Sequence, residues 1–224
     1  MNKRTYLYFF LTIILVALVW YLSTDLNKSS PLGASQTQST TTPSGVGAVS
    51  QLPGGGTLEV VPVDDGGGAV APALGKPIVF TVQYSDAVKA ALKTGIESIE
   101  KKIKAGDASF ENWNMLATYR KQTGDYASAL EIWTYLSHQY STNSVVFINR
   151  ANLYGYYLHD NAKAEVDFKK SIVNGPTEYQ AYYQSILFYR DVTKDLVKAR
   201  AVLDVAKKHL SPDQASDMEK LLKN

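Results

Sequence analysis

A period of 35 residues constrains the fold of this chain more than any other feature. Ala129, Ala164 and Ala199 are each separated by 35 residues. Self-similarity at a fixed period of this length is typical of stacked helical hairpins, in which each unit buries its apolar face only against its neighbours. We therefore expect an all-α fold in this part of the chain. The same spacing separates a set of aspartates and a set of apolar residues: Asp125, Asp160 and Asp195; Trp133, Phe168 and Leu203.

Each unit reads as two antiparallel helices joined by a tight turn. A small residue early in the second helix, such as Ala129, lets that helix approach the first closely. Gly124 can end a first helix because glycine adopts a positive φ without strain, and Pro176 and Pro212 stop second helices. The expected first helices are 110–123, 145–158 and 180–192, and the expected second helices are 126–139, 162–174 and 196–209.

The first unit resembles a known repeat family. The run from Trp113 to Ala117, the run from Gly124 to Ala129, and Trp133 match the pattern of the tetratricopeptide repeat. The resemblance covers about half of the chain and implies an α-solenoid of three helical hairpins. It also implies a class of activity, because most tetratricopeptide repeats are protein-binding scaffolds, and it implies no specific partner.

The sequence departs from the family pattern at a few positions. Arg120 stands where the family usually has an aromatic residue, although Tyr119 is adjacent. His159 and Lys194 replace the turn glycine in the second and third units, and Ser141 stands where proline is common. The repeats run 35 residues instead of the family's usual 34.

Additional helices are expected at both ends of the repeats. In residues 78–109, Ser85 can cap a helix that runs to about Ala105, and an apolar stripe from Val88 to Ile103 repeats every three or four residues. We expect this helix to cover the open face of the first repeat. Residues 110–224 then hold the three repeats and a final capping helix at 212–222.

An uncharged stretch at the N-terminus predicts a membrane anchor in residues 1–22. Residues 5–22 carry no charge, and as a helix they would nearly span a bilayer core of about 30 Å. Lys3 and Arg4 favour a cytoplasmic N-terminus, with the rest of the chain extracytoplasmic. The alternative is a cleaved signal peptide, but the stretch exceeds the usual length of its apolar region. The lipid bilayer is therefore an expected partner of residues 5–22.

Residues 23–77 differ sharply in composition from the rest of the chain. They are rich in Gly, Ser, Thr and Pro, so they are expected to form a flexible, disordered linker. Two β-prone stretches, 57–63 and 77–84, leave two readings open. They form a small hairpin, or they remain extended and weakly ordered, which Pro62 and the glycine-rich gap favour.

Composition argues against several kinds of chemistry. The chain has no cysteine, which excludes disulfides, thiolate catalysis and cysteine-ligated zinc. The net charge is only +2, and the sequence has no basic run that would indicate nucleic acid binding. The three histidines are not spaced as metal ligands, and no nucleophile elbow or marked carboxylate pair is present. We expect no enzyme activity and no cofactor.

The resemblance places the best candidate site on a concave groove lined by the first helix of each repeat. Such a wall of amides, a hydroxyl, charges and apolar groups would suit a short peptide segment; the alternative is that the groove is only solvated. By resemblance, the residues that face the groove are Asn114, Thr118, Lys121, Asn149, Leu153, Tyr156, Gln184, Phe188 and Asp191.

The sequence is compatible with three functions. The first is a membrane-anchored scaffold that binds a protein or peptide through the groove of a short repeat array. The second is a structural component of a cell-envelope complex that self-associates. The third, an enzyme, has the least support, because the sequence shows no catalytic constellation.

Overall fold

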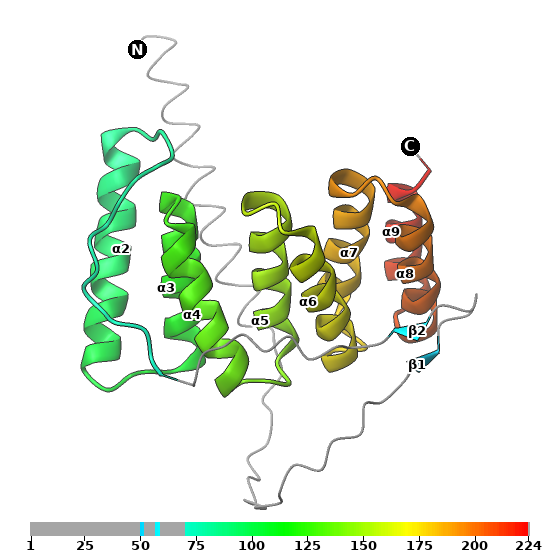
Figure 1. The fold of residues 1–224 in the computed structure, drawn as a ribbon, viewed down its shortest axis with the longest axis horizontal. Helices are drawn as coiled ribbons and strands as arrows, with labels where there is room; N and C mark the ends of the chain where they lie inside the picture. The colour runs from blue at the N-terminus through cyan, green and yellow to red at the C-terminus, as the bar shows by residue number, and fades with distance from the viewer. Residues whose placement is uncertain (1–49, 52–56, 59–69, 224) are drawn as a thin grey trace, which may run out of the picture. The chain divides into compact units, whose positions relative to one another are not determined.

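The computed structural model describes residues 50–51, 57–58 and 70–223, and residues 70–223 are all-helical apart from turns and one extended segment (Figure 1). The all-α prediction is confirmed for this part of the chain. Helices that follow one another in sequence pack side by side from α2 to α9. The helices are α2 (Asp86–Lys104), α3 (Phe110–Thr123), α4 (Tyr126–Gln139), α5 (Ser144–Asn152), α6 (Asn161–Asn174), α7 (Tyr179–Leu187), α8 (Leu196–His209) and α9 (Pro212–Leu221).

The aspartates that recur every 35 residues cap the second helix of each hairpin. The Asp125 side chain accepts a hydrogen bond from the backbone N–H of Ser128, three residues further on. Asp160 and Asp195 do the same for Lys163 and Lys198. A carboxylate at this position satisfies a backbone donor that the helix itself leaves unpaired. The aspartate period therefore has a local cause, repeated once in each hairpin.

The turns between the paired helices share one backbone conformation despite different residues. Gly124 has φ +85°, as a helix-ending glycine does, and His159 and Lys194 occupy the equivalent positions with φ values of 56° and 59°. The helices before His159 and Lys194 each end in a π-helical turn, which the first hairpin does not have. These two wider turns are Leu153–Tyr157 and Phe188–Val192.

The recurring alanines and large apolar residues lie in the core. Ala129, Ala164 and Ala199 are all fully buried at the same place in successive second helices. Trp133 lies in a cluster formed mainly by α2 to α5, and Phe168 and Leu203 lie in a second cluster that reaches α9. The small side chains allow the close approach of paired helices that the period predicted.

A buried ion pair lies between α5 and α6. The guanidinium of Arg150 donates to both oxygens of the Asp167 carboxylate, over 2.7 and 2.8 Å, and to the hydroxyl of Ser137 on α4 over 2.8 Å. The side chains of Arg150 and Asp167 are both almost fully buried. This two-point pairing joins three helices and compensates two charges that would otherwise be costly to bury.

Residues 71–84, which we call the strap, form an extended segment before α2 (Figure 1). Its side chains alternate between covered and exposed along its whole length, because successive side chains of an extended chain point to opposite sides. The end of the expected linker 23–77 packs on the helices, since Leu74 contacts the core and the carbonyls of Lys76 and Pro77 accept hydrogen bonds from Arg120. The covered side chains are those of Pro72, Leu74, Lys76, Ile78, Phe80, Val82 and Tyr84.

The two β-prone stretches do not pair with each other at the described positions. β2 (Thr57–Leu58) pairs antiparallel with β1 (Ser50–Gln51), Ser50 facing Leu58 and Gln51 facing Thr57. The stretch 77–84 is extended, in agreement with the second of the two alternatives. It packs on the helices, however, and is not weakly ordered.

The predicted anchor at residues 1–22 and most of the predicted linker lie outside the described residues. Among the residues that are described, none of the helices has the length and apolar character needed to cross a bilayer.

Candidate functional site

The first helices of neighbouring repeats are joined by their amides. Asn149 on α5 donates from Nδ2 to Oδ1 of Asn114 on α3 over 2.9 Å, and the two residues are 35 positions apart. The same oxygen accepts a hydrogen bond of 2.9 Å from the indole nitrogen of the buried Trp133. Two of the predicted groove residues therefore meet directly, at equivalent positions of successive repeats, and part of their hydrogen-bonding capacity is already used.

Lys121, near the end of α3, lies next to aromatic rings. Its ammonium is 5.6 Å from the centre of the Tyr157 ring, and that ring lies 5.0 Å from the ring of Tyr126. Burial lowers the pKa of Lys121 below its ordinary value. Lys121 takes part in none of the ion pairs formed within residues 70–223. Lys121 is therefore a partly desolvated cation that can donate a hydrogen bond to an external acceptor.

Asp191 acts on the hydroxyl of Tyr156, although the two residues are 35 positions apart. Burial and the nearby charge of Asp191 raise the pKa of the Tyr156 hydroxyl to about 12. The neighbouring Arg190 holds Asp191 by two bonds of 2.6 Å, which lowers the pKa of that carboxyl. These side chains form a polar group at the π-helical ends of the second and third first helices.

Two of the residues predicted to face the groove, Leu153 and Phe188, lie in the interior of the helical domain. Both are fully buried. A Cβ placed on Gly155 would lie 2.8 Å from the ring of Phe188, so the missing side chain of Gly155 makes room for that ring. Since α5 and α7 pack directly on each other, the two side chains fill the core between repeats.

The remaining predicted residues are partly covered, and one further residue was missed. Thr118 donates its hydroxyl to the carbonyl of Asn114 over 2.9 Å, and Gln184 makes a weak 3.4 Å contact with Gln180. Asn152 lies one turn after Asn149 on the same face of α5. Its buried Oδ1 has no hydrogen-bond partner. A comparison of the repeats does not single out Asn152, because the equivalent residue of the first repeat is Ala117, which has no amide.

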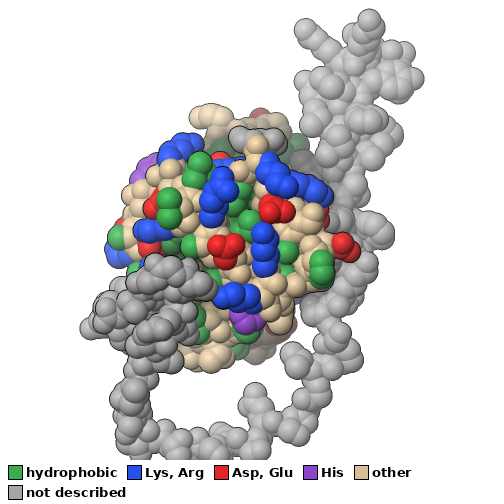
Figure 2. All heavy atoms as spheres, turned by 90° about the vertical axis from the view of Figure 1, so that its right-hand side faces the viewer, with side chains coloured by type: hydrophobic (Ala, Val, Ile, Leu, Met, Phe, Trp, Pro, Cys, Tyr) green, Lys and Arg blue, Asp and Glu red, His purple; other side chains and the backbone are tan. Residues whose placement is uncertain are grey.

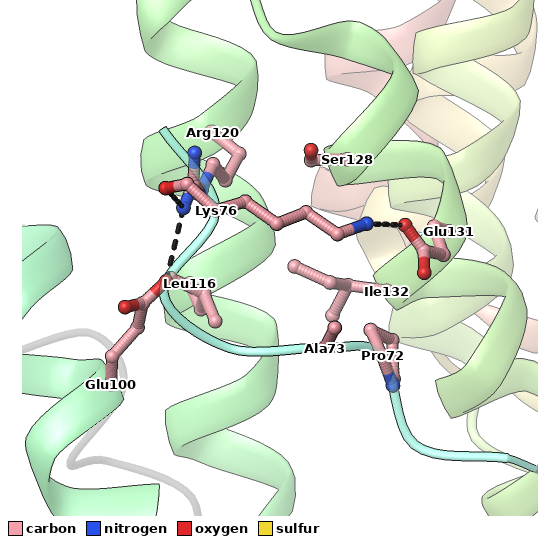
Figure 3. A pocket seen from close by; sticks show the side chains of 9 residues that line it. All are labelled: Pro72, Ala73, Lys76, Glu100, Leu116, Arg120, Ser128, Glu131 and Ile132. Atoms are coloured by element: carbon pink, nitrogen blue, oxygen red, sulfur yellow. Dashed lines mark hydrogen bonds and ion pairs between the residues drawn. The ribbon is translucent and has the colours of Figure 1, made fainter. Parts of the chain in front are cut away.

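A second polar centre lies beneath the strap (Figure 3). The guanidinium of Arg120 on α3 donates to the backbone carbonyl of Lys76 over 2.9 Å. The same group donates to the backbone carbonyl of Pro77 over 2.8 Å. It also donates to Glu100 on α2 over 3.0 Å and to Asp125 over 3.2 Å. Only 2% of the Arg120 side chain is exposed, so all of these bonds form away from bulk water.

Glu100 completes this centre from the other side. One of its carboxylate oxygens pairs with Arg120, and the other accepts a 3.0 Å hydrogen bond from the backbone N–H of Gly75. Lys76 reaches across the site to form an ion pair with Glu131 on α4 (Figure 3). The cavity between the strap and the helices is about 10 Å³, which leaves room for a single water molecule.

The strap is held further along by the end of α3. The backbone N–H of Thr81 donates to the carbonyl of Thr123 over 2.9 Å, and the Tyr84 hydroxyl donates to the carbonyl of Gln122 over 3.2 Å. We call the surface of α2, α3 and α4 that receives the strap the seat; it comprises Glu100, Arg120, Gln122–Gly124 and Glu131. Sequence reasoning missed it, although Arg120 in place of the family's aromatic residue was a signal.

The described side chains of the groove and of the seat do not form a metal site. Within residues 70–223, no three His, Asp or Glu side chains gather closely enough to hold a metal ion.

At the end of the helical array formed by α8 and α9, basic, acidic and scattered hydrophobic side chains are mixed (Figure 2). Val197, in the first turn of α8 beside the charged Lys198, is 80% exposed.

Comparisons with known proteins assign no family. No protein-family model matches the chain. No curated protein matches it either.

Proposed function

We propose that this chain is a membrane-anchored scaffold of tetratricopeptide-like repeats that binds a protein or peptide through the face of its first helices. In this proposal, residues 5–22 anchor the chain with a cytoplasmic N-terminus, and the helical domain is extracytoplasmic. The observation that carries the proposal is the Asn149–Asn114 bond, because it aligns equivalent polar positions of successive first helices. An array built in this way presents the same chemistry at regular intervals.

The groups on this face indicate the chemistry of the partner. The Lys121 ammonium is a donor in a partly desolvated place, and the half-buried amides of Asn149 and Gln184 offer acceptors. Tyr157 adds an aromatic surface that is 41% exposed. Separate donors and acceptors beside an aromatic ring suit an extended peptide, whose backbone offers both C=O and N–H groups and whose side chains can contact the ring.

Photo-crosslinking in cells tests the proposal. A photoreactive amino acid at Tyr156 or Gln184 should capture a defined protein, since both side chains lie on the proposed binding face and are partly exposed. The matched control carries the same group at Val197, which is 80% exposed and lies on a second helix. Capture of the same proteins from Val197 would contradict the proposal.

A substitution at Lys121 makes the test quantitative. Lys121→Met keeps the length of the side chain and removes its charge. It should weaken binding of the captured partner about tenfold, the effect of losing a charge-assisted hydrogen bond. Lys208→Met, an exposed change near the end of α8, is the control and should leave the affinity unchanged. Equal affinity of all three proteins would place the partner elsewhere.

The anchor needs its own test. Deletion of residues 1–22 should release the protein from membranes into the soluble fraction. If the shortened protein still sediments with membranes, the proposed anchor is wrong, whatever the crosslinking experiment shows.

A self-associating structural role is the alternative. Light scattering with and without the captured partner distinguishes the two: binding of the partner favours the scaffold whatever the oligomeric state, and a stable oligomer that binds no partner favours the alternative. The protein used should include residues 70–77, because a chain that begins at residue 78 loses the contacts of Gly75, Lys76 and Pro77 with the seat.

A further inference from the structure

The seat binds the strap chiefly through the backbone of the strap. Arg120 binds two carbonyls of the strap, Glu100 binds one N–H, and the carbonyl of Thr123 binds another. The side-chain contribution includes the partly exposed ion pair between Lys76 and Glu131. Main-chain hydrogen bonds of this kind are how folded domains recognise extended peptides. The strap is therefore bound to the helices much as a separate peptide would be.

The seat is incomplete without an occupant. With the strap absent, Arg120 would lose two acceptors, Glu100 would lose a donor, and Leu74 and Ile78 would lose their packing against the core. Hydrogen bonds to charged groups and buried apolar contacts both stabilise the occupied seat. An empty seat is thus disfavoured, and any extended segment that restores the same bonds is favoured in its place.

We propose that the seat accepts the strap of a second copy of this chain, so that two copies exchange straps reciprocally and form a dimer. The occupant with the right chemistry is already known, since it is the strap itself. An exchanged strap makes every contact that the native strap makes, so the two arrangements differ only at the hinge and in the entropy of association.

The connections of the strap permit this exchange. Within residues 70–223, the strap joins the helices through a single connection, at Tyr84–Ser85, where the chain reverses direction into α2 (Figure 1). Ser85 caps α2 with its side chain and lies outside the helix, so opening this hinge leaves α2 intact. The inference does not depend on peptide binding by the first helices, and either proposal can fail alone.

Mixed single-cysteine variants of the full-length chain in mild detergent test the exchange. The chain has no native cysteine, so Lys76→Cys and Glu131→Cys introduce the only thiols. The two variants are mixed, incubated at high concentration, and treated with a short bismaleimide. Residues 76 and 131 of different chains come close only after exchange. A double variant with both changes, crosslinked at high dilution, reports the same proximity within one chain.

The expected result is a covalent heterodimer between positions 76 and 131, identified by peptide mass, together with internal crosslinking of the double variant. The matched control mixes Lys76→Cys with Glu165→Cys, since Glu165 lies on α6, where its carboxylate pairs with Lys169 and Lys198. Equal crosslinking in this control would show non-specific association and overturn the proposal. If the double variant crosslinks internally but the mixed single variants form no heterodimer, the proposal is also overturned. If neither crosslink forms, residues 76 and 131 are not close in either arrangement, and the seat itself is refuted.

Discussion

Thr81 of the strap lies so close to Gly124 that no side chain fits between them. A Cβ on Gly124 would be 1.8 Å from Thr81 Oγ1, and the hydroxyl of Thr81 donates to the carbonyl of Gly124 over 3.2 Å. Gly124 also has a positive φ of 85° because it ends α3. One glycine therefore serves two purposes, the helix-ending turn and the passage of the strap.

Gly124→Ala tests this double role. The substitution should lower the free energy of unfolding by about 2–4 kcal/mol, the sum of left-handed backbone strain and displacement of the strap. Gly106→Ala is the matched control, because Gly106 has φ +101° with nothing near its Cβ position. It should cost only the strain, about 1 kcal/mol. Urea denaturation measures both, and equal losses would show that Thr81 does not constrain Gly124.

Asp167→Asn should be among the most destabilising single changes. The substitution removes the Asp167 carboxylate from the two-point pair with the buried Arg150 guanidinium, and breaking a buried pair in this way costs about 3–5 kcal/mol. Glu97→Gln is the control, because its ion pair with Lys93 is 3.9 Å long and exposed. It should change the stability by about 0.5 kcal/mol or less. A loss at Asp167 no larger than that at Glu97 would mean that the pair contributes nothing.

The periodic features were predictable because each has a local cause. Asp125 and its two equivalents cap helices that begin beside them, and Ala129 and its equivalents allow helices already paired by a short turn to pack closely. The predicted second helices 126–139 and 196–209 are confirmed without a shift. Such signals act over a few residues, so a single sequence contains them.

The strap and the buried positions Leu153 and Phe188 depend on contacts between distant residues. Arg120 finds its strap acceptors 43 and 44 residues away, in a stretch whose composition suggested a linker. The alternation of large side chains from Leu74 to Tyr84 was present in the sequence, but alternation does not say what an extended chain packs against. Phe188 is buried because Gly155, in the preceding repeat, has no side chain.

Arg120→Met should loosen the strap as well as destabilise the fold. It removes the donor to two strap carbonyls and leaves Glu100 buried without its cation, so a loss of about 3–5 kcal/mol is expected. Chymotrypsin should then cut after Phe80 or Tyr84 much faster than in the parent protein. Arg200→Met, at an exposed position of α8, is the control.

A double variant separates the ion pair from the strap contacts. Glu100→Gln combined with Arg120→Met removes both buried charges, so it should be less destabilising than the sum of the single changes, as is usual for residues in contact. Strict additivity would indicate that Arg120 and Glu100 do not interact. Unchanged cleavage of the strap in Arg120→Met would indicate that the guanidinium does not hold it.

Alkaline pH should destabilise the fold through Tyr156. Its pKa is about 12 in the folded protein, against about 10 in an unfolded chain. Below pH 10 the hydroxyl is protonated in both states, and its contribution to stability is fully present. Between pH 10 and 12 the unfolded chain ionises first, so stability falls as the pH rises through the folded pKa.

Tyr156→Phe removes this titration and should lose less stability than the parent protein between pH 10 and 12, as measured by urea denaturation at a series of pH values. Asp191→Asn removes a charge that helps to raise the Tyr156 pKa, so it should shift the tyrosinate absorbance change to lower pH. Identical pH profiles for the parent and Tyr156→Phe would mean that this hydroxyl ionises equally easily in the folded and unfolded states. Its partial burial beside Asp191 would then have no effect on its charge.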